Sequence, residues 1–201
     1  MIVYDSLQIY KIIDVFFYCR HLRNRNNGVL LPPAENVETE LDCFLLFMSE
    51  DIISKMCIRT NRVIDTLLHS MTPDQRKAQS YVRNTTVSEL KAFFGLMILR
   101  GTYKWNYMDV CTVWKLHPVF SATMSVHRFY FLSKRITFDD PATRDERWLS
   151  DRACAVREFV EELNDNLGGA LQAGNVSNFS FNFGSYQRLY SKGCATKYQT
   201  A

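Results

Sequence analysis

The sequence has no acidic residue after Asp165, although 21 of its 201 residues are aspartate or glutamate. The charged side chains beyond that point are all basic: Arg188, Lys192 and Lys197. Proteins hold hard cations such as Mg²⁺ with carboxylate oxygens. The sequence beyond position 165 therefore offers none of the charged ligands that a divalent ion needs.

Paired cysteines are also missing. No CxxC pair occurs, and no histidine lies at finger spacing from a cysteine, which excludes a zinc finger. Scattered, unpaired cysteines are typical of small core residues in a reducing compartment. The six cysteines are Cys19, Cys43, Cys57, Cys111, Cys154 and Cys194.

Neither a membrane span nor a known catalytic motif is present. The apolar run over residues 9–18 is interrupted by Lys11 and Asp14, and no small-residue cleavage site follows it. Motifs of the GxSxG, Walker, HExxH and glycine-rich nucleotide types are absent. We therefore expect no membrane partner, no cofactor and no small-molecule substrate. The net charge of +3 permits nucleic-acid binding without arguing for it.

What is present is a helical pattern in a chain that is 47% hydrophobic. An amphipathic helix is expected over residues 1–25, followed by a Pro32-Pro33 linker and a boundary near residue 36. The spacing of apolar residues and caps predicts six more helices, over residues 40–48, 49–68, 86–100, 108–115, 125–135 and 151–164.

Local signals set several of these boundaries. Thr86 and Glu89 form a T-x-x-E capping box, and Gly101 is expected to end that helix as a C′ residue. Residues 71–83, with a turn signal at Thr72, and residues 137–149 are expected to be polar and non-helical. Ser150 is expected to cap the last helix.

Several collinear phrases resemble the piggyBac transposable-element-derived family. The family carries a TN pair, an E-[IL]-x-x-[FL]-[LF]-G-L helix, a following G-x-x-K, a Y-W-S tryptophan, M-S-x-x-R-F, L-x-F-[DN]-[DN] and D-K-L-x-x-[IV]-R. The similar stretches here are residues 59–61, 87–96, 101–104, Trp114, 124–129, 136–140 and 151–159. Val113 and Lys115 replace the residues that flank the family's tryptophan.

The resemblance implies a mainly α-helical domain of the DNA-binding or dimerisation type, with a remnant of the first strands of an RNase H-like α/β domain at its C-terminal side. The expected divisions are an unassigned helix and linker over 1–36, the transposase-like helical domain over 37–167, and a remnant over 168–201. Within the remnant, Ser177–Phe183 alternates polar and aromatic residues as a strand does.

The simplest interpretation of the motif residues is structural. Aromatic and apolar members are expected in the core, Gly95 at a close helix contact, and Trp114 as a packing anchor. The motif residues are Asn61, Glu89, Gly95, Gly101, Trp114, Met124, Arg128, Phe129, Phe138, Asp140 and Arg157.

The family's chemistry needs three aspartates that hold two Mg²⁺ ions on an RNase H-like sheet. The first of them lies in a phrase like [ST]-[IVL]-D-E after the last helix, and the corresponding residues 175–184 contain no acid. The given sequence also stops before the family's other two aspartates. We therefore expect no catalytic residues, no metal site and no enzymatic activity.

The resemblance further implies a nuclear protein that binds double-stranded DNA and forms a homodimer. Two alternatives stay open: a protein-interaction module or relic without DNA binding, and a fragment of an active transposase produced by a gene-model error. DNA binding predicts a continuous positive surface around Arg128 to Arg157, whereas the interaction module predicts mixed charge there. The candidate phosphate contacts are Arg128, Lys134, Arg135, Arg144, Arg147, Arg152 and Arg157.

Overall fold

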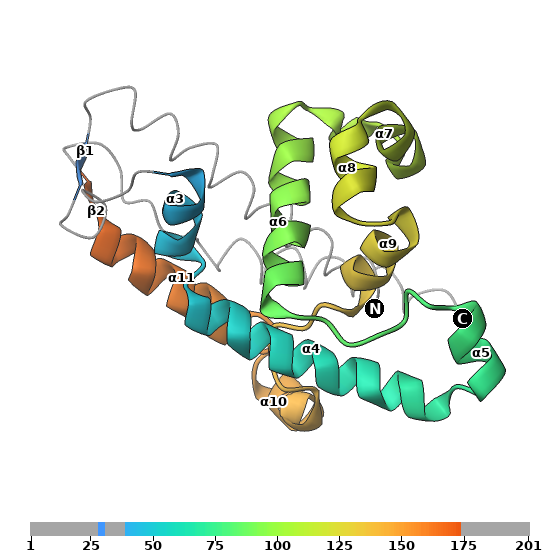
Figure 1. The fold of residues 1–201 in the computed structure, drawn as a ribbon. Coiled ribbons are helices and arrows are strands. Elements are labelled where there is room, and N and C mark those ends of the chain that lie inside the picture. The colour runs from blue at the N-terminus through green and yellow to red at the C-terminus, as the bar shows by residue number, and fades with distance from the viewer. Residues whose placement is uncertain (1–27, 31–38, 174–201) are drawn as a thin grey trace, which may run out of the picture. The chain divides into compact units, whose positions relative to one another are not determined.

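The computed structural model describes residues 28–30 and 39–173. The helix expected over 1–25 and the strand expected over Ser177–Phe183 lie outside these ranges. The described chain is mainly helical, as predicted (Figure 1). Its elements are β1 Gly28–Leu30, α3 Glu40–Phe47, α4 Glu50–Ser70, α5 Pro73–Ala78, α6 Val87–Thr102, η1 Trp105–Tyr107, α7 Val110–Leu116, α8 Pro118–Thr123, α9 Val126–Arg135, η2 Pro141–Thr143, α10 Arg144–Ser150, α11 Arg157–Ala170 and β2 Leu171–Ala173.

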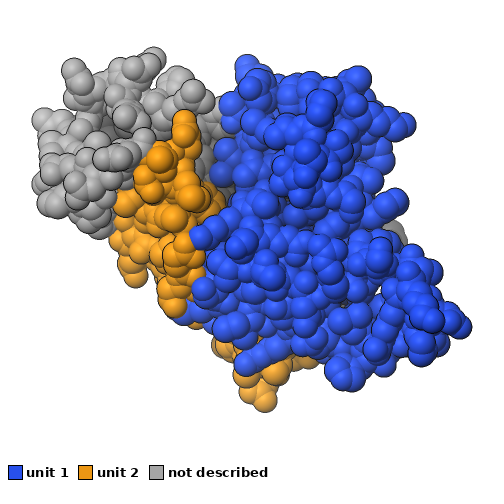
Figure 2. Space-filling model, viewed as in Figure 1, with its two compact units in different colours: residues 1–26, 53–137 blue, residues 27–52, 138–201 orange. Residues whose placement is uncertain are grey.

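The chain divides into two compact units, coloured separately in Figure 2. The described part of unit 1 is residues 53–137, which includes most of α4 and all elements from α5 to α9. The described part of unit 2 is residues 28–30, 39–52 and 138–173. Each unit is described by itself below.

Aromatic residues from several helices form the core of unit 1. Phe129 of α9 packs against Phe93 of α6 at 5.1 Å and against Trp114 of α7 at 4.6 Å between ring centroids. Phe120 of α8 completes the group at 4.8 Å from Trp114. Such tilted ring pairs each contribute about 1 kcal/mol beyond their buried area. Trp114 is therefore a packing residue, as expected.

Helix α6 begins as predicted but ends later. The Thr86 hydroxyl accepts the Glu89 N–H at 3.1 Å, which satisfies one of the free donors at the helix start. The helix continues through Gly101 to Thr102, and the left-handed residue that follows it is Lys104, with φ 58° and ψ 28°. The expectation that Gly101 terminates the helix was wrong, because the Tyr103 N–H still bonds to the Leu99 carbonyl at 3.2 Å.

Two short helices of unit 1 were not predicted. The turn signal at Thr72 is the N-cap of α5, because Thr72 and Gln75 exchange the two hydrogen bonds of a capping box. Pro118 does break the preceding helix, but it also occupies the first turn of α8, where its missing N–H is harmless. Helix α9 has the predicted bounds, with Ser125 as its cap.

Unit 2 pairs α3 with α11. Thr39 and Asp42 form a capping box at the start of α3, and the Asn166 side chain of α11 donates to the Phe47 carbonyl at 2.9 Å. The rings of Phe138 and Phe159 pack against each other in a tilted arrangement, with centroids 4.6 Å apart. Strand β1 pairs antiparallel with β2, with Gly28 opposite Ala173.

Two predictions for unit 2 were wrong. Residues 137–149 were expected to be a loop, yet they contain η2 and most of α10. Ser150 was expected to begin a helix, but it is the last residue of α10, because the Asp151 N–H bonds to the Arg147 carbonyl at 2.8 Å. The next helix begins at Arg157 and runs to Ala170.

Candidate nucleic-acid interface

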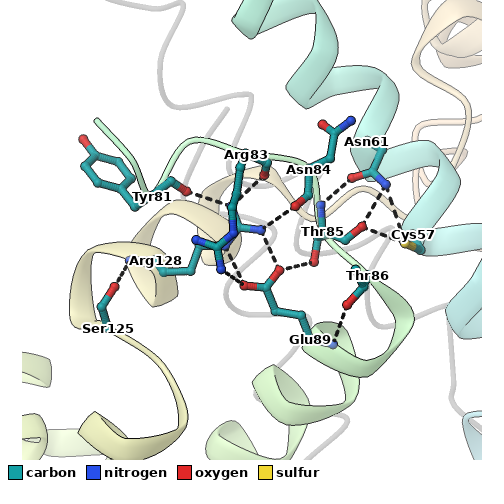
Figure 3. Close-up of polar contacts among 10 residues, drawn as sticks. All are labelled: Cys57, Asn61, Tyr81, Arg83, Asn84, Thr85, Thr86, Glu89, Ser125 and Arg128. Carbon is teal, nitrogen blue, oxygen red and sulfur yellow. Dashed lines mark hydrogen bonds and ion pairs between the residues drawn. The ribbon is translucent and has the colours of Figure 1, made fainter. Parts of the chain in front are cut away.

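The segment that joins α5 to α6 in unit 1 is fixed by an asparagine of α4. The Asn61 side chain accepts the Thr85 N–H at 2.8 Å and donates to the Thr85 carbonyl at 3.0 Å (Figure 3). The Cys57 thiol donates to the same carbonyl at 3.4 Å, and burial raises the pKa of that thiol. The Asn61 side chain therefore supplies hydrogen-bond partners to the backbone of Thr85, which lies outside any helix or strand.

Arg128 of α9 occupies the centre of this network (Figure 3). Its side chain is 2% exposed. Two nitrogens donate to the two carboxylate oxygens of Glu89, from Nε at 2.8 Å and from Nη2 at 2.7 Å. The remaining N–H groups donate to backbone carbonyls, those of Tyr81 and Arg83 at 2.8 Å and that of Asn84 at 3.2 Å. All five guanidinium donors thus have partners inside the protein.

Glu89 is the counter-charge of this network. Burial acts to raise its pKa, but hydrogen bonds from Arg128 and Thr85 and the positive charges of Arg128 and Arg83 outweigh that effect and lower it. The carboxylate is therefore ionised at neutral pH and neutralises Arg128. The sequence predicted Glu89 as half of a capping box, whereas its side chain bonds to Arg128 and Thr85.

A second network lies in unit 2 around Asp139, whose side chain is 2% exposed. Arg147 donates to the Asp139 carboxylate at 2.8 Å and to the Asp140 and Cys154 carbonyls at 3.0 and 3.1 Å. Arg144 forms an ion pair with the same carboxylate. The network joins Asp139 and Asp140, which precede α10, to Cys154, which follows it.

Arg157 is also engaged within unit 2. Its guanidinium pairs with Asp151, donating from Nη2 at 2.7 Å. The hydrogen bond from Arg157 lowers the pKa of Asp151, with burial opposing it and the Ala153 N–H assisting. This pair holds the turn that separates α10 from α11.

The candidate phosphate contacts therefore fall into two groups. Arg128, Arg144, Arg147 and Arg157 hold internal networks, and Arg128 does not reach the surface. The exposed candidates are Lys134, Arg135 and Arg152. Lys134 and Arg135 end α9 in unit 1, whereas Arg152 lies in unit 2.

Charge is distributed very unequally between the units. Residues 53–137 contain thirteen lysines and arginines and four acidic residues, a net charge of +9. Residues 39–52 and 138–173 together contain four arginines and thirteen acidic residues, a net charge of −9. The whole-chain value of +3 conceals this segregation, so the sequence argument missed unit 1 as the basic part.

The other motif residues are structural. Trp114 donates from Nε1 to the Met124 carbonyl at 2.7 Å, and Phe129 and Phe138 are buried. Asp140 caps η2 by accepting the Ala142 N–H at 3.1 Å. Gly95 was expected at a close helix contact, and the described residues show none: apart from the backbone of its own helix, no described atom lies within 4 Å of a Cβ built there.

Two further side-chain arrangements were not anticipated. Arg100, which follows the apolar run of residues 92–99 in α6, is 4% exposed and donates to the Trp105 and Met108 carbonyls at 3.2 and 2.6 Å. Tyr103 and Trp105 form a ring stack beside it. A charged residue at the end of a long apolar run was the available signal for Arg100, because such a residue needs buried partners.

Among residues 39–173, no cluster of three metal-ligating side chains is found. None of the described helices combines the length and the apolar character that crossing a bilayer requires.

Fold and charge together define a helical domain with one strongly basic unit and an arginine-centred core. A protein-family model described as Transposase IS4 matches residues 39–176, more than half of the chain. The chain belongs to that family and is a transposase-derived protein. No curated protein and no solved structure matches it.

Proposed function

We propose that this chain is a piggyBac-type, transposase-derived domain that binds double-stranded DNA through unit 1. The observation that supports it most is the net charge of +9 on residues 53–137. Basic proteins gain affinity for DNA by releasing the cations condensed on its phosphates. Lys134 and Arg135, exposed at the end of α9, are the proposed phosphate contacts retained from the sequence prediction.

The piggyBac assignment is supported by the way three separate motif phrases meet. Asn61 comes from the first phrase, Glu89 from the second and Arg128 from the fifth. Thr85 joins them, since it bonds to Asn61 through its backbone and to Glu89 through its hydroxyl at 3.0 Å. Residues that lie far apart in sequence but share one network are expected to occur together as a family signature.

An electrophoretic mobility shift on duplex DNA at two salt concentrations tests DNA binding. We expect a complex at about 50 mM salt whose affinity falls at least about tenfold by about 200 mM, because several phosphate contacts release counterions. Absence of a complex at the lower salt concentration would rule the proposal out.

We further propose that the 201-residue polypeptide does not cleave DNA. The acids with described arginine partners, Glu89, Asp139 and Asp151, each neutralise a guanidinium. Residues 175–184, where the resemblance places the first catalytic aspartate, contain no acid. Incubation of supercoiled plasmid with the protein and Mg²⁺ should leave the plasmid intact. Mg²⁺-dependent nicking or strand transfer would contradict this.

A protein-interaction module without DNA binding remains the second candidate. Its support is the mixed charge over residues 128–157, where three of the arginines are paired with Asp139 or Asp151. This candidate predicts no mobility shift at any salt concentration. Dimerisation and nuclear location, which the resemblance implies, stay predictions.

A further inference from the structure

Three aromatic rings form a stack just beyond α6 in unit 1. Tyr103 lies against Trp105 with ring centroids 4.6 Å apart and planes 16° apart. Trp105 also lies against His117, with centroids 3.6 Å apart and planes 15° apart. The three rings are nearly parallel and continuous.

The backbone beneath this stack is held in place. Lys104, between Tyr103 and Trp105, adopts the left-handed conformation that residues other than glycine rarely take. Its N–H bonds to the Gly101 carbonyl at 2.9 Å, and buried Arg100 donates to the Trp105 carbonyl. The surrounding structure thus imposes a conformation that places two rings, two residues apart, face to face.

The outer end of the stack is open to solvent. Tyr103 is 57% exposed although one of its faces lies against Trp105, so the opposite face is available. A stacked ring with a free face is the geometry on which an unpaired base packs, and such packing tolerates any base. Bases within a duplex have no free face to offer.

The charge around the stack suits a nucleic acid. Lys104 is exposed at the tip of the turn, and Lys115 is exposed on α7. Residues 53–137, the described part of unit 1, have a net charge of +9. An apolar peptide segment would use the ring but not the charge, which favours a polyanion as the occupant.

We propose that Tyr103 ends a stacking platform for an unpaired base of DNA, and that the protein therefore prefers distorted or partly unpaired DNA over a perfect duplex. This rests on the proposed DNA binding by unit 1. Phosphate contacts alone do not distinguish paired from unpaired DNA. The stacking platform would add a preference for DNA with exposed bases.

Two DNA molecules test the proposal, a duplex and the same duplex with a short run of unpaired thymines at its centre. Both have the same ends, so binding at the ends cancels. The variant is Tyr103→Ala, and the matched control is Tyr107→Ala, which removes a tyrosine of η1 that is 98% exposed. Tyr103→Phe keeps the aromatic ring and removes only the hydroxyl, so it shows whether a substitution at this position disturbs folding.

We expect the wild type and Tyr107→Ala to bind the unpaired DNA at least about fivefold more tightly than the duplex, since one stacked base has about that effect. Tyr103→Ala should lose this preference and keep its duplex affinity, and Tyr103→Phe should retain the preference. Equal affinity of the wild type for both DNAs would overturn the platform and leave DNA binding standing.

Two other outcomes are equally decisive. Binding to neither DNA would overturn both proposals. If Tyr103→Ala altered only the oligomeric state, measured by light scattering, the exposed ring would be a protein contact and the platform would be overturned.

Discussion

At the scale of single residues, the fold of unit 1 depends on the buried guanidinium of Arg128. The Arg128 side chain of α9 bonds to the start of α6 and to the segment between α5 and α6. Among the described residues, no ladder of backbone hydrogen bonds connects these three parts. Glu89 supplies the only negative charge that a described contact brings to it. A buried charge left without its partner is strongly unfavourable, so each member of the pair requires the other.

Replacement of Arg128 by methionine should lower the free energy of unfolding by about 3 kcal/mol, because Glu89 and three carbonyls lose their buried donors. Arg83→Met is the matched control. Arg83 also pairs with Glu89, but its side chain is 59% exposed, so the loss should be at most about 1 kcal/mol. Urea unfolding measures both, and similar losses would show that burial of Arg128 is not what matters.

The same pair predicts a pH dependence. The pKa of Glu89 is lowered from the ordinary value of 4.5, and that of Asp151 is lowered from 3.8. A carboxyl whose pKa is lower in the folded state stabilises the fold above its ordinary pKa and loses that contribution as the pH falls through the lowered value. Stability should therefore fall below about pH 4.5, and Glu89→Gln should make the fall shallower. An unchanged pH profile in that variant would contradict the assignment.

At the scale of elements, α6 contains a glycine against which no described side chain packs closely. Gly95 is exposed, and a Cβ there meets no described atom within 4 Å. Glycine inside a helix is less favourable than alanine by about 0.5–1 kcal/mol. A glycine at such a position is a weak point of an otherwise well-packed helix.

Gly95→Ala should accordingly raise the free energy of unfolding by about 0.5–1 kcal/mol. The expected sign is opposite to that predicted by a close helix contact at this position, so a single urea titration separates the two. If the variant gains stability but loses duplex binding, the glycine leaves room for DNA. Destabilisation would mean that a neighbour lies closer than the described atoms do.

Short elements were harder to predict than long ones. Helix α9 was predicted to the residue, because Ser125 caps it and Ile136 ends an apolar face. Helix α10 was missed because its seven residues, four of them charged, have no apolar stripe. Its stability comes from Asp139, which lies before the helix and pairs with Arg144 and Arg147 inside it.

At the scale of the whole molecule, the segregation of charge determines which arginines the proposed DNA binding by unit 1 would use. Arg135 lies in the described part of unit 1, of net charge +9, and Arg152 in the described part of unit 2, of net charge −9. Both are exposed. The described part of unit 2 has thirteen carboxylates against four guanidiniums, a charge balance that opposes phosphate binding.

Arg135→Ala should therefore weaken duplex binding and reduce the slope of log affinity against log salt by about 1. Arg152→Ala removes the same side chain from unit 2 and should leave both quantities unchanged. Fluorescence anisotropy at several salt concentrations measures the slopes. Equal effects of the two substitutions would contradict the assignment of DNA binding to unit 1.

The sequence by itself determined the helical class, the main helices and the relation to transposases. These depend on local periodicity, on caps such as Ser125, and on short sequence motifs that occur in the expected order along the chain. Each is a property of residues that lie within a few positions of one another.

Only the tertiary structure decided what the charged side chains do. Arg128 and Glu89 are 39 positions apart, and Asn61 and Thr85 are 24 apart, so no local pattern reveals that they meet. Arg128 was predicted as a phosphate contact, yet the fold places it in the core. Whether an arginine faces water or a carboxylate is decided by the packing of distant helices, since burial without a partner is too unfavourable to persist.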